Sequence, residues 1–234
     1  MPDTIKLHML GPSVNNLSVR VFLRAAGLPF EEVNAWGATR TPEYMAKIPS
    51  SLTPAIESPE LPRGALWESC AIMMYLSNKH KLDSLYPTDP GRRAQIDAAN
   101  FYLVSSIYPL LARATYEKLG FGTYAGEVAT SDADDAAKAK ARRDCEDALE
   151  KPFEAMRTFF IGKGGFIGDG DKPTIADIRF AASLEFCALF ERQLPQWAQD
   201  YVARVEKALG KAYSEPASDV RGYVASRKPT AVNA

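Results

Sequence analysis

The sequence predicts two parts, an α/β domain with a small mixed sheet followed by an all-helical domain. Strand and helix patterns alternate over residues 1–84, and a segment rich in Pro, Asp and Gly follows. Every later apolar pattern has the three- and four-residue spacing of helices. A chain of 234 residues with 46% apolar residues is long enough for two small cores.

The first part begins with a β-α-β pattern. The apolar run Ile5–Leu10 predicts a strand, and the helical spacing from Leu17 to Ala26 ends at Gly27. A second strand is predicted at Phe30–Asn34. Because a helix connects the two strands, we expect them to lie parallel.

After an irregular stretch with several prolines, the pattern changes to a hairpin. Two short runs, Pro54–Glu57 and Ala65–Trp67, flank the turn-rich SPELPRG, and a helix is predicted from Ser69 to about Asn78. The order β-α-β followed by β-β-α is thioredoxin-like, with the first two strands parallel and the last two antiparallel.

The segment SLYPTDPGRRA separates two helical patterns, and we place a linker there at residues 85–91. It divides the chain into a thioredoxin-like domain, 1–84, and an all-helical domain, 92–234. Residues 120–135 are predicted to form a mobile connection, and the chain from Ser226 onward is expected to fray. Four helical patterns are predicted beyond the linker: Arg92–Leu119, Asp134–Ile161, Ile175–Phe190 and Pro195–Leu209.

Composition excludes several classes of partner. The 28 Lys plus Arg nearly balance the 29 Asp plus Glu, so nucleic acid is not expected. No stretch is long enough for a membrane span, and the N-terminal residues resemble neither a signal nor a transit peptide. The cysteines, Cys70, Cys145 and Cys187, are far apart and form no C-x-x-C, so neither a disulfide framework nor a metal is predicted. We therefore expect a cytoplasmic protein.

Three local patterns resemble those of the glutathione transferase family. The first, SVNNLSVRVFLRAAGLPFEEV at residues 13–33, is similar to the family's strand-loop-helix entry. The loop lies at a helix N-terminus, where free N–H groups and the macrodipole favour an anion such as a thiolate. The resemblance implies that Ser13 donates a hydrogen bond to the sulfur of glutathione, with Asn15 as second candidate and Ser18 also open. An ordinary capping loop is the alternative.

The second pattern is PEYMAKIPSSLTPAIES, at residues 42–58. It resembles the family segment in which a cis-proline, here Pro54, presents the backbone of Thr53 to the cysteinyl part of glutathione. The chain departs from the family form Asn-Pro-x-Gly-Lys, because Leu52 stands where a lysine often meets the glycyl carboxylate. We name Arg40 and Lys47 as candidate substitutes for that lysine.

The third pattern, LWESCAIMMYL at residues 66–76, resembles the family's Glu-Ser-x-Ala-Ile helix start. The resemblance implies that Ser69 caps the helix and binds the α-carboxylate of the γ-glutamyl residue, while Glu68 pairs with its ammonium. A fourth pattern, Thr174 with Asp177, is similar to the family's N-capping box, and we assign it to folding.

A pocket for an electrophile is expected between the loop after the first strand and the first long helix beyond the linker. Helical spacing places several aromatic and hydroxyl side chains on one face of that helix. Ordinary packing between the domains is the alternative, and Tyr108, Tyr213 and Tyr223 are weaker candidates. The predicted pocket comprises Leu10, Pro12, Tyr102, Ser105, Ser106, Pro109, Arg113 and Tyr116.

The resemblance implies a bacterial, theta-like enzyme that joins the thiolate of glutathione to a small hydrophobic electrophile, such as an epoxide or an alkyl or aryl halide. It also implies a homodimer, with glutathione as co-substrate and no metal. Two other functions remain open at this stage. One is a glutathione-dependent disulfide oxidoreductase, and the other is a non-catalytic binding protein that keeps the fold.

Overall fold

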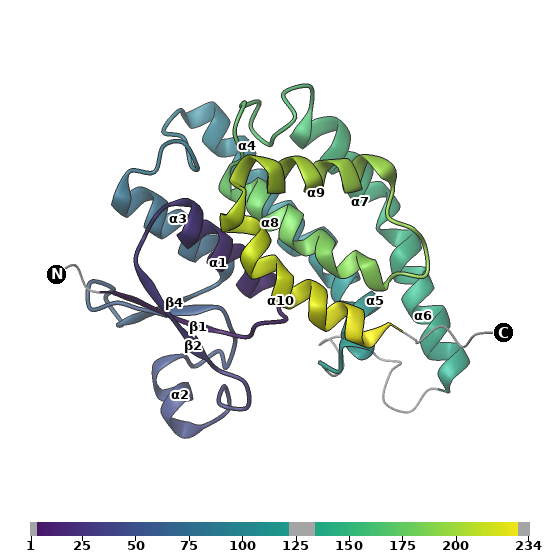
Figure 1. Ribbon diagram of the computed structural model, residues 1–234, viewed down its shortest axis with the longest axis horizontal. Coiled ribbons are helices and arrows are strands. Elements are labelled where there is room, and N and C mark those ends of the chain that lie inside the picture. The colour runs from purple at the N-terminus through teal and green to yellow at the C-terminus, as the bar shows by residue number, and fades with distance from the viewer. Residues whose placement is uncertain (1–3, 122–133, 229–234) are drawn as a thin grey trace.

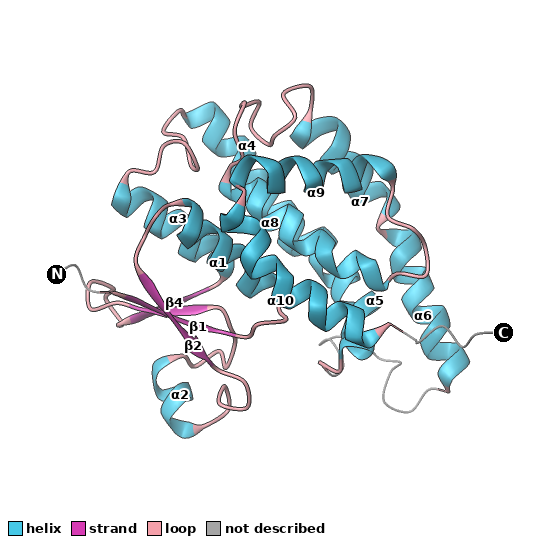
Figure 2. Ribbon diagram, viewed as in Figure 1, coloured by secondary structure: helices cyan, strands magenta, loops and turns pink. Residues whose placement is uncertain are grey.

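The computed structural model describes residues 4–121 and 134–228 and shows a small sheet beside a larger group of helices (Figures 1 and 2). The strands β1 (Ile5–Met9), β2 (Phe30–Asn34), β3 (Ala55–Glu57) and β4 (Ala65–Trp67) lie in the order β2-β1-β3-β4. β1 runs parallel to β2 and antiparallel to β3, and β3 runs antiparallel to β4. The predicted thioredoxin-like sheet is confirmed.

Alternation along β1 decides which helices cover each face of the sheet. Its odd-numbered residues are buried, whereas Lys6 is exposed. The buried face packs against α1 (Val14–Ala25) and α3 (Ser69–His80). The opposite face carries α2 (Pro42–Lys47) over a smaller apolar cluster (Figure 1). The loop after β1 and the start of α1 are thereby held at one edge of the sheet.

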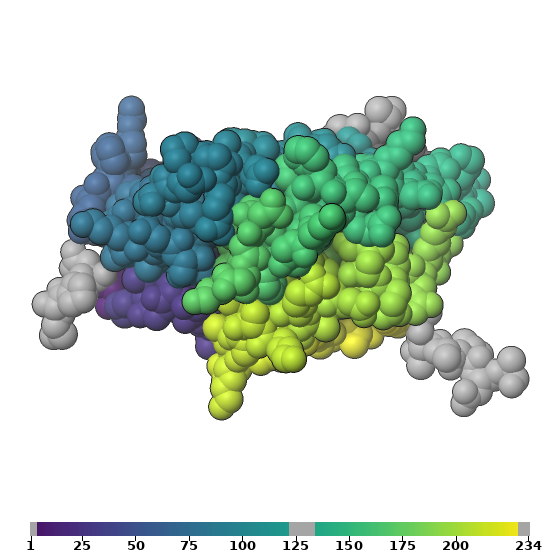
Figure 3. Space-filling view, turned by 90° about the horizontal axis from the view of Figure 1, so that it is seen from above, coloured from purple at the N-terminus to yellow at the C-terminus, as the bar shows by residue number. Residues whose placement is uncertain are grey.

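The helical part contains α8 (Ile175–Leu184), all of whose residues are buried. α8 contacts α1 and α3 as well as α4 and α9, so it joins the helical part to the sheet part. The two parts form one continuous body (Figure 3). No helix among the described residues is both long and apolar enough to cross a membrane. The other helices are α4 (Pro90–Tyr102), α5 (Tyr108–Leu119), α6 (Asp135–Ala148), α7 (Glu150–Ala155), α9 (Gln196–Leu209) and α10 (Lys211–Arg227).

Two helices are absent from the sequence-based prediction. α2 begins at Pro42 directly after Thr41, whose side chain accepts a hydrogen bond from the Tyr44 N–H at 3.3 Å. Proline suits this first helical position, so it starts the helix there. α10 contains Pro216, which argues against a helix, but the tertiary contacts of its buried face outweigh the lost backbone hydrogen bond.

Three predicted irregular segments have different outcomes. α10 extends to Arg227, so the fraying expected from Ser226 is wrong for those two residues. Residues 122–133 of the predicted mobile connection lie outside the described residues. At the predicted linker, Leu85 is buried and its carbonyl accepts a hydrogen bond from the Ile175 N–H at 2.9 Å. The linker is therefore fixed against α8, and the division at 85–91 stays a prediction.

The start of α8 is held by the predicted capping box. The Asp177 carboxylate accepts hydrogen bonds from the Thr174 N–H at 2.7 Å and from the Thr174 hydroxyl at 2.8 Å. It also accepts from the Ile167 N–H at 2.9 Å and from the Tyr201 hydroxyl at 2.6 Å. Burial raises the pKa of Asp177 to about 6, while the four donors oppose that rise. The carboxylate is therefore ionised at neutral pH and ties three segments together.

We expect Asp177→Asn to lower the free energy of unfolding by at least about 3 kcal/mol. The amide group replaces an acceptor by a donor among several buried donors, and each unsatisfied one costs about 1–3 kcal/mol. Urea unfolding measures the change. Asp135→Asn, in the exposed first turn of α6, is the matched control and should cost no more than about 1 kcal/mol. Equal losses in the two variants would show that Asp177 has no special structural role.

Candidate active site

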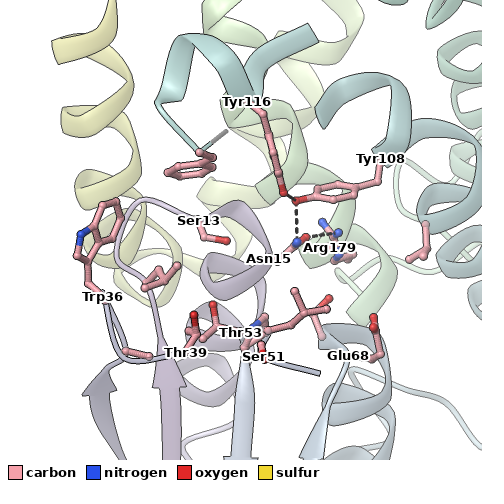
Figure 4. Close-up of a pocket in the computed structure, with 18 of the residues that line it drawn as sticks. Ser13, Asn15, Trp36, Thr39, Ser51, Thr53, Glu68, Tyr108, Tyr116 and Arg179 are labelled. Atoms are coloured by element: carbon pink, nitrogen blue, oxygen red, sulfur yellow. Dashed lines mark hydrogen bonds between the residues drawn. The ribbon is translucent and has the colours of Figure 1, made fainter. Parts of the chain in front are cut away.

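A cleft of about 530 Å³ opens between the loops at one edge of the sheet and the helical part (Figure 4). It is lined by the loop after β1, the first turn of α1, segments 35–39 and 51–54, the start of α3, and residues near or on α5 and α8. Ser13 and Asn15 lie between Tyr108 and Tyr116 on one side and Thr53 on the other. Among the described residues, no group of His, Cys, Asp and Glu is arranged to hold a metal ion.

Ser13 occupies the N-cap position of α1, with extended backbone angles of φ −87° and ψ 128°. Its N–H donates to the Leu10 carbonyl at 3.1 Å, which closes the turn after β1. The side chain makes no capping hydrogen bond, although its position in the chain is that of a cap. The hydroxyl therefore stays available in the cleft, beside the free N–H groups of the first helical turn.

The side-chain amide of Asn15 is held from both ends. Its Nδ2 donates to the Tyr108 hydroxyl at 2.7 Å, and its Oδ1 accepts a hydrogen bond from Arg179. The hydroxyls of Tyr108 and Tyr116 lie 2.6 Å apart, which extends the chain of hydrogen bonds to the far wall of the cleft (Figure 4). Asn15 is thus less available than Ser13 to bind a ligand.

Arg179 brings a buried charge to this network. Its side chain comes from the middle of α8, and the residue is only 2% exposed. The guanidinium also donates to the Ser183 hydroxyl, and its central carbon lies 5.0 Å from the centre of the Tyr108 ring. Its Nε atom is buried without a hydrogen-bond partner. The cation therefore contributes positive potential where the first turn of α1 meets the cleft.

The segment around Thr53 forms one wall of the cleft. The Thr53–Pro54 peptide bond is cis, as the sequence predicts. The Asn16 amide donates to the Thr53 hydroxyl at 3.1 Å, and the Tyr44 hydroxyl donates to the Leu52 carbonyl at 2.7 Å. The backbone N–H and C=O of Thr53 make no hydrogen bond within the described chain. They can pair with an extended ligand in the manner of an added strand.

The start of α3 forms a second polar wall. Ser69 is the first helical residue and Glu68 occupies the N-cap position, so the expected cap at Ser69 is corrected by one residue. Glu68 has φ 73° and ψ 111° and makes no capping hydrogen bond. A positive φ in such a residue costs about 1–3 kcal/mol, which is typical of a functional site. The N–H groups of the first turn are left for an anion.

Arg40 and Lys47, the predicted substitutes for the family lysine, do not line the cleft. The Lys47 ammonium pairs with the Glu57 carboxylate at 3.0 Å. Partial burial raises the pKa of Glu57, but hydrogen bonds from His8 and Lys47 outweigh it and hold that pKa below its usual value. Lys47 is therefore occupied by a structural ion pair, and the exposed Leu52 lines the cleft instead.

Only part of the predicted electrophile pocket lines the cleft. Leu10 and Tyr116 line the cleft, as do Val104 and Tyr108. A π-helical turn, Leu103–Ile107, interrupts the long helical pattern and shifts the face that follows it. A regular helix over this stretch would place a different set of side chains toward the cleft. Predicted residues that do not line the cleft are Pro12, Tyr102, Ser105, Ser106, Pro109 and Arg113.

Of the weaker tyrosine candidates, only Tyr108 lines the cleft. Tyr213 is buried and donates to Glu185 at 3.0 Å, and Tyr223 donates to the Leu119 carbonyl at 2.7 Å. The sequence analysis misses Arg179, although an arginine within the apolar run IADIRFAASL is a detectable signal of a buried polar contact. The other lining residues absent from the prediction are Ala35, Trp36, Gly37, Thr39, Ser51, Val104, Gly120 and Phe121.

The cleft has two ends of different character. Thr39, Ser51 and Glu68 lie at its polar end (Figure 4). At the other end, the Phe121 ring meets those of Trp36 and Tyr116, with centroid distances of 6.4 and 5.4 Å. A polar, peptide-like ligand fits the first end and an apolar ligand fits the second, with Ser13 and Asn15 between them.

Comparison with known proteins gives the family of the N-terminal part. Residues 3–78 match the family model of the glutathione S-transferase N-terminal domain. Over 210 residues the chain is 27% identical to glutathione S-transferase theta-3 of Mus musculus, covering 87% of this chain and 82% of that protein. The match thus extends well beyond the sheet part into the helices.

Solved structures show the same two-part fold. The Bombyx mori glutathione transferase BmGSTD1 has a TM-score of 0.74 at 27% identity, covering 97% of this chain and 99% of that chain. Human glutathione S-transferase T1-1 in its apo form has a TM-score of 0.77 at 20% identity, covering 98% of this chain and 93% of that chain. Human glutathione transferase theta-2, in complex with glutathione and an unknown ligand, has a TM-score of 0.77 at 20% identity, covering 95% and 90%.

We expect Asn15→Ala to lower the free energy of unfolding by about 1.5–3 kcal/mol, because Arg179 loses a charge-assisted hydrogen bond inside the protein. Urea unfolding monitored by circular dichroism measures this loss. Asn78→Ala, at an exposed position of α3, is the control and should change stability by no more than about 0.5 kcal/mol. A loss at Asn15 as small as that at Asn78 would contradict the buried network.

Proposed function

The chain belongs to the glutathione S-transferase family, and from that premise we propose that it conjugates the thiolate of glutathione to a small hydrophobic electrophile. The observation that carries this proposal is the Ser13 hydroxyl at the start of α1, which makes no capping hydrogen bond and lies between the polar and aromatic ends of one cleft. The same premise leads us to propose a cytoplasmic homodimer that uses glutathione as co-substrate.

In this proposal, each part of glutathione binds to a different group of residues in the cleft. The γ-glutamyl carboxylate binds at the free N–H groups of α3 beside Ser69, and its ammonium pairs with Glu68. The cysteinyl backbone pairs with Thr53, which directs the sulfur toward Ser13. The glycyl end lies near hydroxyls such as that of Thr39, because neither of the predicted basic substitutes lines the cleft.

Thiol activation by Ser13 accounts for only part of the catalysis. A free thiol has a pKa of about 8.5, and lowering it by two units takes about 2.7 kcal/mol. One charge-assisted hydrogen bond of about 1.5–3 kcal/mol and a helix terminus of about 0.3–1 kcal/mol suffice. A thiolate of lower pKa is also a weaker nucleophile, with a Brønsted coefficient of about 0.4–0.5. This loss cancels most of the gain from the larger thiolate fraction, so the net increase in rate is only a few-fold. Placement of the electrophile must supply more.

The aromatic end of the cleft supports that second role. The hydroxyls of Tyr108 and Tyr116 lie beside Asn15 and can donate to an oxygen that becomes negative as the electrophile reacts. Opening of an epoxide by the thiolate creates such an alkoxide. The apolar rings of Trp36 and Phe121 suit the hydrocarbon part of the same substrate.

Neither alternative function gains a specific observation. A disulfide oxidoreductase needs a reactive thiolate, and Cys70 is the cysteine next to the cleft. Burial raises the pKa of the Cys70 thiol, which favours the unreactive thiol form. Turnover of hydroxyethyl disulfide alone, with no turnover of an epoxide or an aryl chloride, would nevertheless select that alternative.

Isothermal titration calorimetry with glutathione tests the binding half of the proposal. We expect Glu68→Gln to weaken binding about tenfold, because the ammonium of the γ-glutamyl group loses its charged partner. Glu43→Gln on α2, an exposed acid outside the cleft, should leave the affinity unchanged. If the wild-type chain binds no glutathione at millimolar concentration, both the conjugation and the disulfide functions are wrong, and the binding protein remains.

The pH dependence of kcat/KM with an epoxide tests the chemical half. We expect Ser13→Ala to raise the pKa of the bound thiol by about one to two units and to lower kcat/KM at neutral pH roughly three- to tenfold. The difference in kcat/KM between Ser13→Ala and the wild type should disappear above the raised pKa, where the thiol is ionised even without the Ser13 hydrogen bond. Ser13→Thr keeps a hydroxyl and should retain most of the wild-type profile. An unchanged profile in Ser13→Ala would assign the donor role to another group.

A further inference from the structure

We propose that Arg179 is a positioning residue for glutathione transfer, which holds the Asn15 amide in one orientation and supplies the positive charge that faces the sulfur. The inference rests on the proposed function and deepens it. It assigns to α8, a helix of the second part of the chain, a role on the thiol side of the cleft. Two independent observations carry it: the direction of the hydrogen bonds, and the lack of a carboxylate partner for Arg179 among the described residues.

The direction of the hydrogen bonds follows from the chemistry of the guanidinium. Arginine has only donors, so the Asn15 atom that contacts Arg179 must be its oxygen, Oδ1. Nδ2 is thereby turned toward the Tyr108 hydroxyl, to which it donates at 2.7 Å. Flipping the amide would place two donors against each other inside the protein. Arg179 therefore fixes Asn15 as a donor toward the cleft and Tyr108 as an acceptor from it.

The direction of these hydrogen bonds also constrains the hydroxyls of Tyr108 and Tyr116. Because the Tyr108 oxygen accepts from Asn15, the proton of its own hydroxyl is directed away from Asn15, toward the Tyr116 oxygen at 2.6 Å or another acceptor. Tyr108 and Tyr116 therefore belong to one chain of hydrogen bonds that starts at Arg179.

The charge of Arg179 has no counter-ion in the described part of the chain. Among the described residues, the groups that its guanidinium meets are the Asn15 amide, the Ser183 hydroxyl, the Cys70 thiol and the Tyr108 ring, and its Nε has no hydrogen-bond partner. A buried cation without a counter-ion is costly, because its hydration is lost and no opposite charge replaces it. A thiolate at Ser13 would supply the missing negative charge, which makes the cation complementary to the bound anion.

The titratable groups around Arg179 leave this charge uncompensated. From α3, burial keeps the Cys70 thiol in its neutral form although Arg179 opposes that effect, and Glu68 is exposed at the rim of the cleft. From α5, Tyr108 and Tyr116 are phenols. On α8 itself, the Asp177 carboxylate is directed to the donors that hold the start of the helix.

Arginine suits this role better than lysine for two reasons. Arginine side chains in general carry their charge independently of the pH at which a thiol ionises, whereas a buried lysine can lose its proton. The guanidinium fork of Arg179 also reaches Asn15 and Ser183 at the same time, which a single ammonium cannot do with the same geometry. Charge and orientation can therefore be separated by substitution.

The experiment compares the wild type with Arg179→Met, Arg179→Lys and Asn15→Asp. The thiolate of bound glutathione is titrated by its ultraviolet absorption, and kcat and KM are measured across pH. Arg179→Met removes the charge, and we expect the thiol titration to move upward by about one to two pH units. Arg179→Lys keeps the positive charge, so the pKa of the bound glutathione thiol should stay within about half a unit of its wild-type value. We expect kcat to fall at least about fivefold in this variant, because the Asn15 amide is no longer held in one orientation.

Asn15→Asp is a second variant, included because the loss of the buried Arg179 side chain in Arg179→Met could by itself disturb folding. The new carboxylate accepts from Arg179 and neutralises it while preserving their contact, so we expect a stable protein whose thiol titration moves upward as in Arg179→Met. If Arg179→Met and Asn15→Asp bind glutathione and both titrate within about 0.3 units of the wild type, the inference is overturned. If the wild type binds no glutathione, the proposed function fails first, and the calorimetric titration shows this separately.

Discussion

The four hydrogen bonds to the buried Asp177 carboxylate fix the start of α8, and the position of α8 decides the rest of the structure. This helix is buried along its whole length and contacts helices of both parts of the chain. A shift at its first turn would move Arg179, two residues further on, away from the start of α1. Folding and the electrostatics of the cleft thus depend on two opposite charges two residues apart on one helix. Asp177 is satisfied by four donors, whereas Arg179 has no carboxylate partner among the described residues.

The cleft combines several backbone groups that the fold leaves without partners. The helices α1 and α3 both begin at its edge without a side-chain cap, so their first N–H groups can meet negative charge. The Thr53 backbone offers a strand edge between them. Strain at Glu68 is consistent with a binding role, because a residue other than glycine is held there in a conformation that favours glycine. Leaving such polar groups without hydrogen bonds costs free energy, and a bound ligand that pairs with them removes that cost.

The sequence predicts best those features that depend on neighbours along the chain. Apolar runs and turn residues predict the four strands, with the first two parallel and the last two antiparallel, and the T-x-x-D spacing predicts the capping box at Thr174. The cis bond before Pro54 is also predicted from its local pattern. It predicts least well the inward face of the helix after the linker, because a one-residue π insertion at Leu103–Ile107 leaves no mark in the apolar spacing.

The sequence by itself therefore determined the sheet, most of the helices and the polar wall of the cleft, since each of these depends on short-range periodicity, turns and caps. Tertiary structure alone decided which side chains meet across the cleft. Arg179 and Asn15 are 164 positions apart, and no local pattern links them. Lys47 is drawn into an ion pair with Glu57, and the aromatic end is assembled from Trp36 and Phe121. Such contacts depend on how α8 packs against the sheet part, which is a property of the whole core.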